Sequence, residues 1–523
     1  MNTRHSLILC CLAVVGASVV SAQTPPPGDA ATTFDRWYML EMSGEHAGWA
    51  HTTERRKGDR IVSQTDMKIT VRRGDQAITI EHTMWFVETL DGQPIEASST
   101  LKPGAVAIVQ HAKFTDNRIE LTTGQGNAAR TTAVPALDGS YLPPAAAQRL
   151  IEKRIAQGAK EISVGLIDAS MGVTALDTSM TLAGKENVQV FGKVVPAVVW
   201  ETRASNLPGV TMREYVDTQG RSVKSSIQLM PGMDITMIEA DEQLAKAQVD
   251  PPRVMAQTLI RPDRPIQSPR TSRSAIYRVS VKGADGTAIS LPRTGYQRVV
   301  WDNRSTAAVV LDLDQPVNAI DDLPTDADLE SSNMIDHHSD AVRKLLDRAL
   351  PDSDREMSDV QKASRLRAFV HDYIDEKDLS VGLATAGEVA ATAQGDCTEH
   401  AVLLTALLRG NGIPARTVTG LLYVDRFLGQ RGVFGYHMWT QAWVTGESGG
   451  AVGEHPGENT SGGGGGPSGG RWIDLDAVLE GHDFDAAHIA LSVSSMADGQ
   501  MVNDMIGMLP VFGRLDVKVI QTQ

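Results

Sequence analysis

Apolar and polar side chains alternate with a period of two over most of residues 34–250. Met67 to Val71 and Ala77 to Glu81 are typical runs, and turn signals such as Arg73-Gly74-Asp75 separate them. Short alternating runs with recurring turns indicate antiparallel strands that bury one face. We therefore predict a large antiparallel sheet, curved like a half-barrel, over residues 34–250, interrupted by one helix at residues 144–157.

Two stretches of this β-rich region resemble each other. Met84 to Ile95 and Met212 to Val223 share apolar positions and place a polar residue and a glycine at the turn, Asp91-Gly92 in the first and Gln219-Gly220 in the second. Each predicts a hairpin. The similarity has two interpretations, a duplicated β unit of the kind found in curved lipid-carrier sheets or the likeness that hairpins share by chance.

The pattern changes after residue 250. Residues 251–275 are rich in Pro, Arg and Ser and are interpreted as a linker. A small β segment follows at residues 276–324, where alternation returns. Apolar residues then recur at helical spacing in three segments, 340–350, 359–374 and 397–409. The whole pattern predicts an α+β protein in which a β-rich region precedes a region that contains helices.

After the third predicted helix, an alternating strand begins at His437 and continues to Val444. It is followed by residues 446–470, which hold 12 glycines among 25 residues and which we interpret as a disordered insertion of low complexity. Alternation resumes at Arg471 and continues to Asp476. Without the insertion, the two strands are close enough in sequence to form one hairpin.

The first 22 residues have a charged start, an apolar centre from Leu7 to Val20 and an Ala-x-Ala-like exit. This pattern predicts a secretory signal peptide, and the short apolar run makes a membrane anchor the weaker alternative. Residues 23–33 are interpreted as a flexible stem. We expect a protein exported to the periplasm or the extracellular space, without an integral membrane span. The net charge of -15, or -16 once Arg4 leaves with the signal peptide, argues against a nucleic acid partner.

Beyond the signal peptide the chain contains one cysteine, Cys397. A lone thiol cannot form an intramolecular disulfide, and it is a poor start for a zinc site. It lies in Gly395-Asp396-Cys397 at the predicted start of a helix, where free N–H groups and the positive end of the helix dipole favour a thiolate. A thiolate nucleophile needs an imidazole and a group that orients it, and His437 and Asp476 are the candidates.

Five segments around these residues resemble the transglutaminase-like family, whose core shares the papain-like thiol fold. The matching segments are Gly395 to Ala401, Ala406 to Arg409, Gly412 to Arg416, Tyr436 to Thr440, and Trp472 to Asp476. The resemblance covers residues 325–515 and implies a helix bearing Cys397 packed on an antiparallel sheet. It implies that Cys397 is the nucleophile, His437 the general base and Asp476 the carboxylate that orients the histidine.

The chain departs from the family pattern at two places. Asp476 is followed by Ala477-Val478, where Pro-Thr is usual, and Gln441 stands where the family more often has Glu. Neither change removes a member of the implied triad. Asp474 is the rival to Asp476, because period-two alternation places both on the same face of the strand.

Other residues have structural explanations as well as functional ones. His400 lies one helical turn after the thiol, and helix packing explains it more simply than a direct role. Trp439, Trp443 and Trp472 are expected in the core or in the walls of a cleft. The pairs His337-His338 and His482-Asp483 lack a specific ligand spacing. We therefore predict no metal and no cofactor.

The resemblance implies a thiol-dependent acyl-transfer enzyme that acts on a carboxamide or peptide bond through a thioester. Water would resolve the thioester in a protease or amidase, and an amine would resolve it in a crosslinking acyltransferase. Because water is in large excess, hydrolysis is the expected default, with a protein or peptide as the substrate. Two alternatives remain: a catalytically silent envelope scaffold that binds through the β-rich region, and a β-region carrier of lipid or peptide with an enzyme attached.

Overall fold

The computed structural model describes residues 31–523 with fourteen internal gaps. The gaps are residues 74–75, 103–106, 125–128, 171, 206–209, 231–232, 254, 284–287, 318–321, 352–355, 376–383, 446–468, 498–506 and 509–510. The predicted signal peptide, most of the predicted stem and most of the glycine-rich insertion lie outside the described residues.

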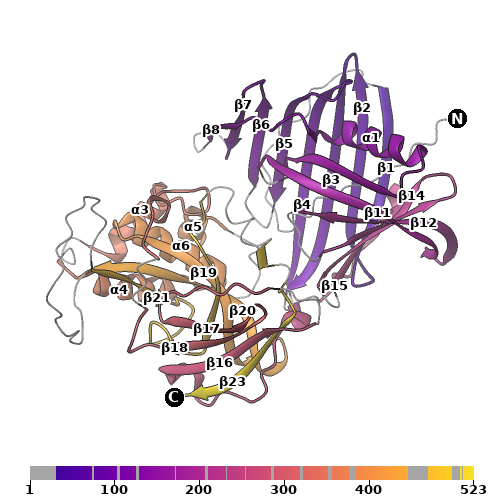
Figure 1. Cartoon of the computed structure of the whole chain (residues 1–523). Helices are drawn as coiled ribbons and strands as arrows, with labels where there is room; N and C mark the ends of the chain where they lie inside the picture. The colour runs from indigo at the N-terminus through magenta and orange to yellow at the C-terminus, as the bar shows by residue number, and fades with distance from the viewer. Residues whose placement is uncertain are drawn as a thin grey trace, which may run out of the picture.

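The N-terminal region is one fifteen-stranded sheet, as predicted from its alternation (Figure 1). Its order is β8-β7-β6-β5-β4-β3-β2-β1-β15-β14-β13-β12-β11-β10-β9, antiparallel except between β9 and β10. The strands are β1 (Ala31–Met42), β2 (Glu45–Lys57), β3 (Arg60–Arg73), β4 (Gln76–Thr89), β5 (Pro94–Lys102), β6 (Ile108–Phe114), β7 (Arg118–Thr123), β8 (Arg130–Pro135), β9 (Tyr141–Leu142), β10 (Glu161–Asp168), β11 (Thr174–Val190), β12 (Lys193–Ala204), β13 (Met212–Asp217), β14 (Ser222–Met230) and β15 (Met233–Ala240).

The two similar stretches form equivalent hairpins, β4–β5 and β13–β14. In the first, Gly92 donates its N–H to the Thr89 carbonyl at 3.0 Å. In the second, Gly220 donates to the Asp217 carbonyl at the same distance. Both glycines have a positive φ, which a residue without Cβ adopts at no steric cost. The two hairpins thus share a turn geometry as well as a sequence pattern.

The predicted helix is α1 (Pro144–Ala156), and it covers part of the apolar face of the sheet. Its Ala147 and Ile151 pack with Met180 and Trp200, which alternation in β11 and β12 turns toward the same side. The stem prediction is wrong at its end, because Ala31 already pairs with Arg56 in β1 and β2. Local composition there suggested a flexible segment, whereas pairing with a neighbouring strand decides the conformation.

The segment interpreted as a linker follows α2 (Glu242–Ala245) and lies against the C-terminal region. It contains the short helices η2 (Met255–Thr258) and η3 (Pro269–Thr271). Between them, Ile260 is buried and exchanges backbone hydrogen bonds with Phe434 at 2.9 and 2.7 Å. This segment is therefore attached to the strand that carries His437.

The C-terminal region has three layers (Figure 1). Its helices pack on a sheet of order β21-β20-β19-β22, whose other face packs on a sheet of order β17-β18-β16-β23. The elements are η4 (Asp326–Asp328), α3 (Asp340–Ala349), α4 (Asp359–Tyr373), α5 (Ala386–Thr392), α6 (Cys397–Gly410), β16 (Ser274–Val281), β17 (Gln297–Asn303), β18 (Thr306–Asp312), β19 (Ala415–Phe427), β20 (Gln430–Thr445), β21 (Gly470–Leu475), β22 (His488–Ser494) and β23 (Leu515–Thr522). No helix in the described part of the chain is both long and apolar enough to cross a membrane.

The three helices predicted from apolar spacing are α3, α4 and α6, and the α+β fold class is confirmed. The small β segment is not a unit by itself, because β16 pairs on one side with β18 and on the other with β23 from the end of the chain. His437 lies inside β20 rather than at the start of a strand. The alternation before it is interrupted by Gly432 and Gly435, yet the strand continues through them, and Gly435 pairs with Leu422 of β19.

Arg409 at the end of α6 ties three segments of the C-terminal region together. Its guanidinium donates to the backbone carbonyls of Ala415 at 2.9 Å, Glu330 at 2.7 Å and Ser495 at 2.6 Å. The side chain is buried, and burial lowers the pKa of Arg409 to about 10. The planar guanidinium suits this role, because it carries five donors in a fixed arrangement.

We expect Arg409→Met to destabilise the C-terminal region by about 2–4 kcal/mol, because it leaves buried carbonyls without donors. Urea unfolding followed by tryptophan fluorescence measures the effect. The control is Arg343→Met, since the Arg343 side chain is 63% exposed and pairs with Asp340; it should change stability by less than about 0.5 kcal/mol. Equal effects of the two substitutions would contradict this role of Arg409.

Candidate active site

Cys397 is the first residue of α6 and is partly exposed. Asp396 caps the helix and accepts hydrogen bonds from the backbone N–H groups of Thr398 and Glu399. The Glu399 carboxylate in turn accepts the Asp396 N–H at 3.0 Å, which completes a capping box. The cap fixes the first turn of the helix, so the thiol is held at the positive end of the helix dipole.

The turn before the thiol requires glycine at position 395. Gly395 has φ +151, and a Cβ there would lie 2.2 Å from the Glu399 Cβ. Glu399 is buried, and burial together with the neighbouring Asp396 charge raises the pKa of Glu399 to about 8. The motif Gly395-Asp396-Cys397-Thr398-Glu399 is therefore a packed helix start that leaves the thiol partly accessible.

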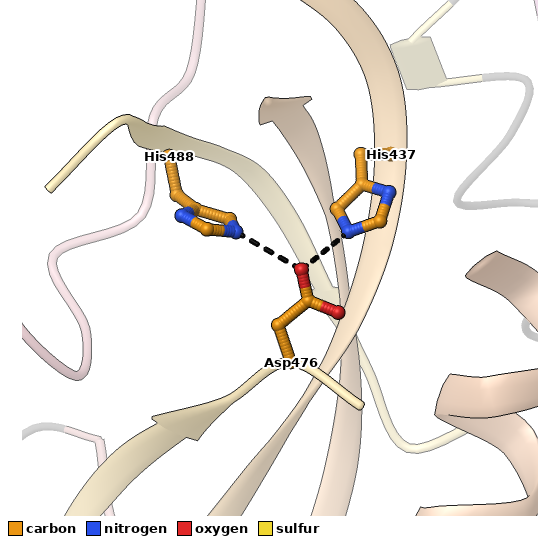
Figure 2. Close-up of side chains that lie close together, drawn as sticks. All are labelled: His437, Asp476 and His488. Atoms are coloured by element: carbon orange, nitrogen blue, oxygen red, sulfur yellow. Dashed lines mark hydrogen bonds and ion pairs between the residues drawn. The ribbon is translucent and has the colours of Figure 1, made fainter. Parts of the chain in front are cut away.

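His437 lies on β20, where it pairs with Gly420 of β19. Its Nε2 donates to Asp476 Oδ2 at 2.8 Å (Figure 2), and its ring is hydrogen-bonded to the Cys397 thiol. Burial opposes protonation, but the Asp476 charge and these hydrogen bonds outweigh it and raise the pKa of His437 to about 10. The imidazole therefore favours the protonated form, which places a positive charge beside the thiol.

Asp476 follows directly after β21 and is 1% exposed. Its Oδ1 accepts the Val478 N–H at 2.8 Å, and its Oδ2 accepts from both His437 and His488. Burial alone would raise its pKa, but the His437 charge and the two histidine hydrogen bonds hold the pKa of Asp476 well below the usual range. The structure thus brings together all three residues predicted from the sequence.

Asp474, the rival carboxylate, faces other partners. Its Oδ1 accepts from Trp439 Nε1 and Gln441 Nε2, each at 2.8 Å, and its Oδ2 accepts the Tyr296 N–H at 3.1 Å. These contacts hold the Trp439 ring beside His437, with 6.2 Å between ring centroids. The structure therefore places Asp476, and not Asp474, against the candidate base.

Gln441, the departure from the family pattern, is explained by its three hydrogen-bond partners. Its amide nitrogen donates to Asp474, while its Oε1 accepts from Arg416 Nε at 3.1 Å and from the Thr294 hydroxyl at 3.0 Å. A glutamate here would turn an acceptor toward the buried Asp474 carboxylate. The amide satisfies a carboxylate on one side and a guanidinium on the other.

The remaining sequence candidates have structural contacts. His400 Nδ1 lies 2.5 Å from the Asp396 carbonyl of its own helix. His337 is buried, and burial lowers its pKa to about 4. His482 lies 3.3 Å from Asp485, while the neighbouring Asp483 forms an ion pair with Arg367 at 2.9 Å. All three tryptophans predicted in the core or cleft walls, Trp439, Trp443 and Trp472, are buried.

His488 is the residue that sequence reasoning missed. It begins β22 and lies on the side of Asp476 opposite His437 (Figure 2), with Nε2 3.2 Å from Asp476 Oδ2. The available sequence signal was an Asp-x-x-His pattern, Asp485 to His488, at the start of an apolar strand. That pattern is common, and only the tertiary fold shows that this histidine reaches Asp476.

Ligand atoms of His437, Asp476 and His488 lie within 4.8 Å of one another, the spacing of a possible metal site. Their polar atoms already face one another as hydrogen-bonded ion pairs. The neighbouring carboxylates raise the pKa of both histidines, so the site favours protonated imidazoles. A metal ion would have to displace these protons in order to bind. The arrangement therefore fits a proton-holding site, and we assign no metal to it.

Residues 348–477 match the model of the transglutaminase-like superfamily. This part of the chain, which contains Cys397, His437 and Asp476, is a transglutaminase-like domain, so the resemblance read from the sequence is confirmed. No curated protein matches the chain.

Two solved structures are similar to the chain at low identity. One is a candidate cysteine protease from Cytophaga hutchinsonii, with 14% identity and a TM-score of 0.26, covering 48% of this chain and 86% of that one. The other is a candidate protease from Parabacteroides distasonis, with 9% identity and a TM-score of 0.18, covering 75% of this chain and 68% of that one. The match to the transglutaminase-like superfamily is confined to residues 348–477.

The raised pKa of His437 predicts how its contribution to stability depends on pH. An unfolded histidine has a pKa of about 6.5, so the contribution is fully present below about pH 6.5 and is lost as the pH rises through about 10. We expect the melting temperature difference between wild type and His437→Gln to be largest near pH 6 and to shrink toward pH 10. Gln430→Asn on the same strand is the control, and its melting temperature difference from wild type should not change with pH. A melting temperature difference for His437→Gln that does not change with pH would contradict the prediction.

Gln441→Glu tests the explanation for the departure from the family pattern. We expect it to destabilise the protein by about 2–4 kcal/mol at neutral pH, because two carboxylates would face each other in a buried site. Thermal unfolding measures the loss, and the loss should shrink at acid pH as one carboxyl gains a proton. The exposed Gln315→Glu is the control. Equal melting temperatures for the two variants would contradict the explanation.

Proposed function

We propose that the protein is a thiol-dependent acyl-transfer enzyme in which Cys397, His437 and Asp476 form the catalytic triad. The observation that carries the proposal is the position of His437, hydrogen-bonded through Nε2 to the buried Asp476 and in contact with the Cys397 thiol at the start of α6. Nucleophile, base and orienting carboxylate in this order are the arrangement that activates a thiol.

In the first half of the reaction, His437 holds the proton of Cys397 as an imidazolium. The thiolate attacks the carbonyl carbon of a carboxamide or peptide bond, a C–S bond forms, and an electron pair moves to the carbonyl oxygen. The Cys397 N–H is the candidate oxyanion donor, because the Asp396 side chain already accepts the next two N–H groups of the helix, those of Thr398 and Glu399. Collapse breaks the C–N bond, and His437 gives its proton to the departing amine.

In the second half, neutral His437 accepts a proton from water or from an acceptor amine that attacks the thioester. The C–S bond breaks, the acyl group leaves on the new oxygen or nitrogen, and the thiolate–imidazolium pair returns. Water is the default acceptor because it is in large excess. We therefore favour hydrolysis of an amide or peptide over crosslinking.

A protein or peptide outside the cytoplasm is the proposed substrate. The sequence of residues 1–22 has the pattern of a signal peptide, and a chain with one thiol beyond that segment does not depend on disulfides for stability. Export to the periplasm or the extracellular space would place the enzyme among envelope or secreted peptides.

The reactivity of Cys397 with iodoacetamide tests the proposal without a known substrate. The rate is followed from acid to mildly alkaline pH on the peptide that contains Cys397, so that Cys10 and Cys11 do not contribute. We expect rapid alkylation well below pH 8.5, because the imidazolium favours the thiolate. His437→Gln and Asp476→Asn should each slow alkylation at pH 6 by about 10–100-fold.

His111→Gln is the matched control for these variants. His111 also bonds a carboxylate, Glu96 at 2.7 Å, but it lies on β6 of the N-terminal sheet. Its replacement should leave the rate within about twofold of wild type. Alkylation of wild type that rises only near pH 8.5, the value of an ordinary cysteine, would overturn the proposal and favour the scaffold alternative.

A further inference from the structure

His488 is held between two carboxylates in the interior of the domain. Its Nε2 lies 3.2 Å from Asp476 Oδ2, and its Nδ1 lies 3.0 Å from both the side-chain Oδ1 and the backbone carbonyl of Asp485. The histidine is completely buried, and Asp476 and Asp485 are each 1% exposed. Phe484 stacks on the His488 ring with 4.2 Å between centroids, and Trp439 packs against it in a T-shaped arrangement at 5.1 Å.

This geometry determines the protonation of His488. An ionised carboxylate only accepts hydrogen bonds, and so does a backbone carbonyl. Both ring nitrogens must therefore donate, which requires the positively charged imidazolium. Burial opposes that charge, but the Asp485 charge and the hydrogen bonds to both carboxylates raise the pKa of His488.

The charged groups around His488 come from several elements. Asp476 and Asp485 contact it directly, and Asp474 and His437 are the next neighbours. Asp485 Oδ2 is paired with Arg270 of η3 at 2.9 Å and with His482 at 3.3 Å. The Arg270 charge helps to keep Asp485 ionised, so Asp485 can hold His488 in the charged form.

The reaction proposed above creates a specific need for this charge. Once His437 has given its proton to the departing amine, it is neutral. If His488 were also neutral, Asp476 would then be a buried carboxylate without a cationic partner. A buried, uncompensated carboxylate tends to take up a proton. A protonated Asp476 could no longer orient His437 as the base for the second half of the reaction.

We propose that His488 is a positioning residue that stays positively charged through turnover and keeps Asp476 ionised while His437 loses and regains its proton. The active site is then a chain of alternating charge, from Cys397 through His437, Asp476 and His488 to Asp485. The inference rests on the proposed function, because it assigns His488 a role in that reaction. It also adds a residue that the implied triad does not contain.

His488→Gln tests the inference, because it keeps an N–H donor near Asp476 and removes the charge. The readout is the midpoint pH at which Cys397 alkylation by iodoacetamide becomes rapid. Loss of a positive charge makes the neighbouring thiolate and imidazolium sites bind protons more tightly. We expect the midpoint to move up by about one pH unit, since the His437 and His488 ring centroids are 6.0 Å apart.

His482→Gln is the matched control, because His482 bonds the same Asp485 carboxylate but has no hydrogen bond to Asp476. The midpoint pH of Cys397 alkylation in this variant should equal that of wild type. An unshifted midpoint in folded His488→Gln, with a slower rate at every pH, would overturn the inference and leave His488 a packing residue. The proposed function fails separately, when wild type itself shows only the reactivity of an ordinary thiol.

A measurement on the intact chain covers the case in which His488→Gln does not fold. Nitrogen chemical shifts of ¹⁵N-histidine-labelled protein at pH 8 distinguish imidazolium from neutral rings. We expect a second imidazolium besides His437, which remains when His437→Gln removes the first. Absence of any imidazolium in His437→Gln at pH 8 would overturn the inference.

Discussion

The burial of one carboxylate, Asp476, is the constraint on which the active site depends. Removing a charge from water is costly unless hydrogen bonds and opposite charges compensate for it. Asp476 receives one backbone N–H and two histidine N–H groups. The same contacts that make its burial tolerable orient His437 toward Cys397, so the stability of this carboxylate and the geometry of the candidate base have a common cause.

The position of Asp476 depends in turn on parts of the chain that are distant in sequence. Its N–H donates to the Asp483 carbonyl at 2.8 Å, and Asp483 forms an ion pair with Arg367 of α4. On the other side, Arg270 holds Asp485 and Ser272 accepts the Ala486 N–H at 2.9 Å. The loop between β21 and β22 is thus attached to a helix and to the segment that follows the N-terminal sheet.

The sequence predicted the features that local patterns encode. Alternation indicated the large sheet, apolar spacing indicated α3, α4 and α6, and the glycine before Cys397 marked the helix start. It did not predict that β23 completes the sheet of β16 or that His488 reaches Asp476. Those contacts join residues that are far apart in sequence, and pairing of this kind depends on packing that no local pattern contains.

Phe512 is an aromatic side chain that connects the N-terminal sheet with the strand that carries His437. Phe512 packs against the apolar cluster of the sheet and stacks on Tyr436 at 4.0 Å, while the Tyr436 hydroxyl accepts the Gly513 N–H at 3.1 Å. Tyr436 directly precedes His437. Since aromatic packing is dense and strongly shape-dependent, a change in the sheet at this cluster would act on the strand that carries His437. The sheet is therefore packed against the strand that carries His437, and the two regions are joined by more than the segment that connects them in sequence.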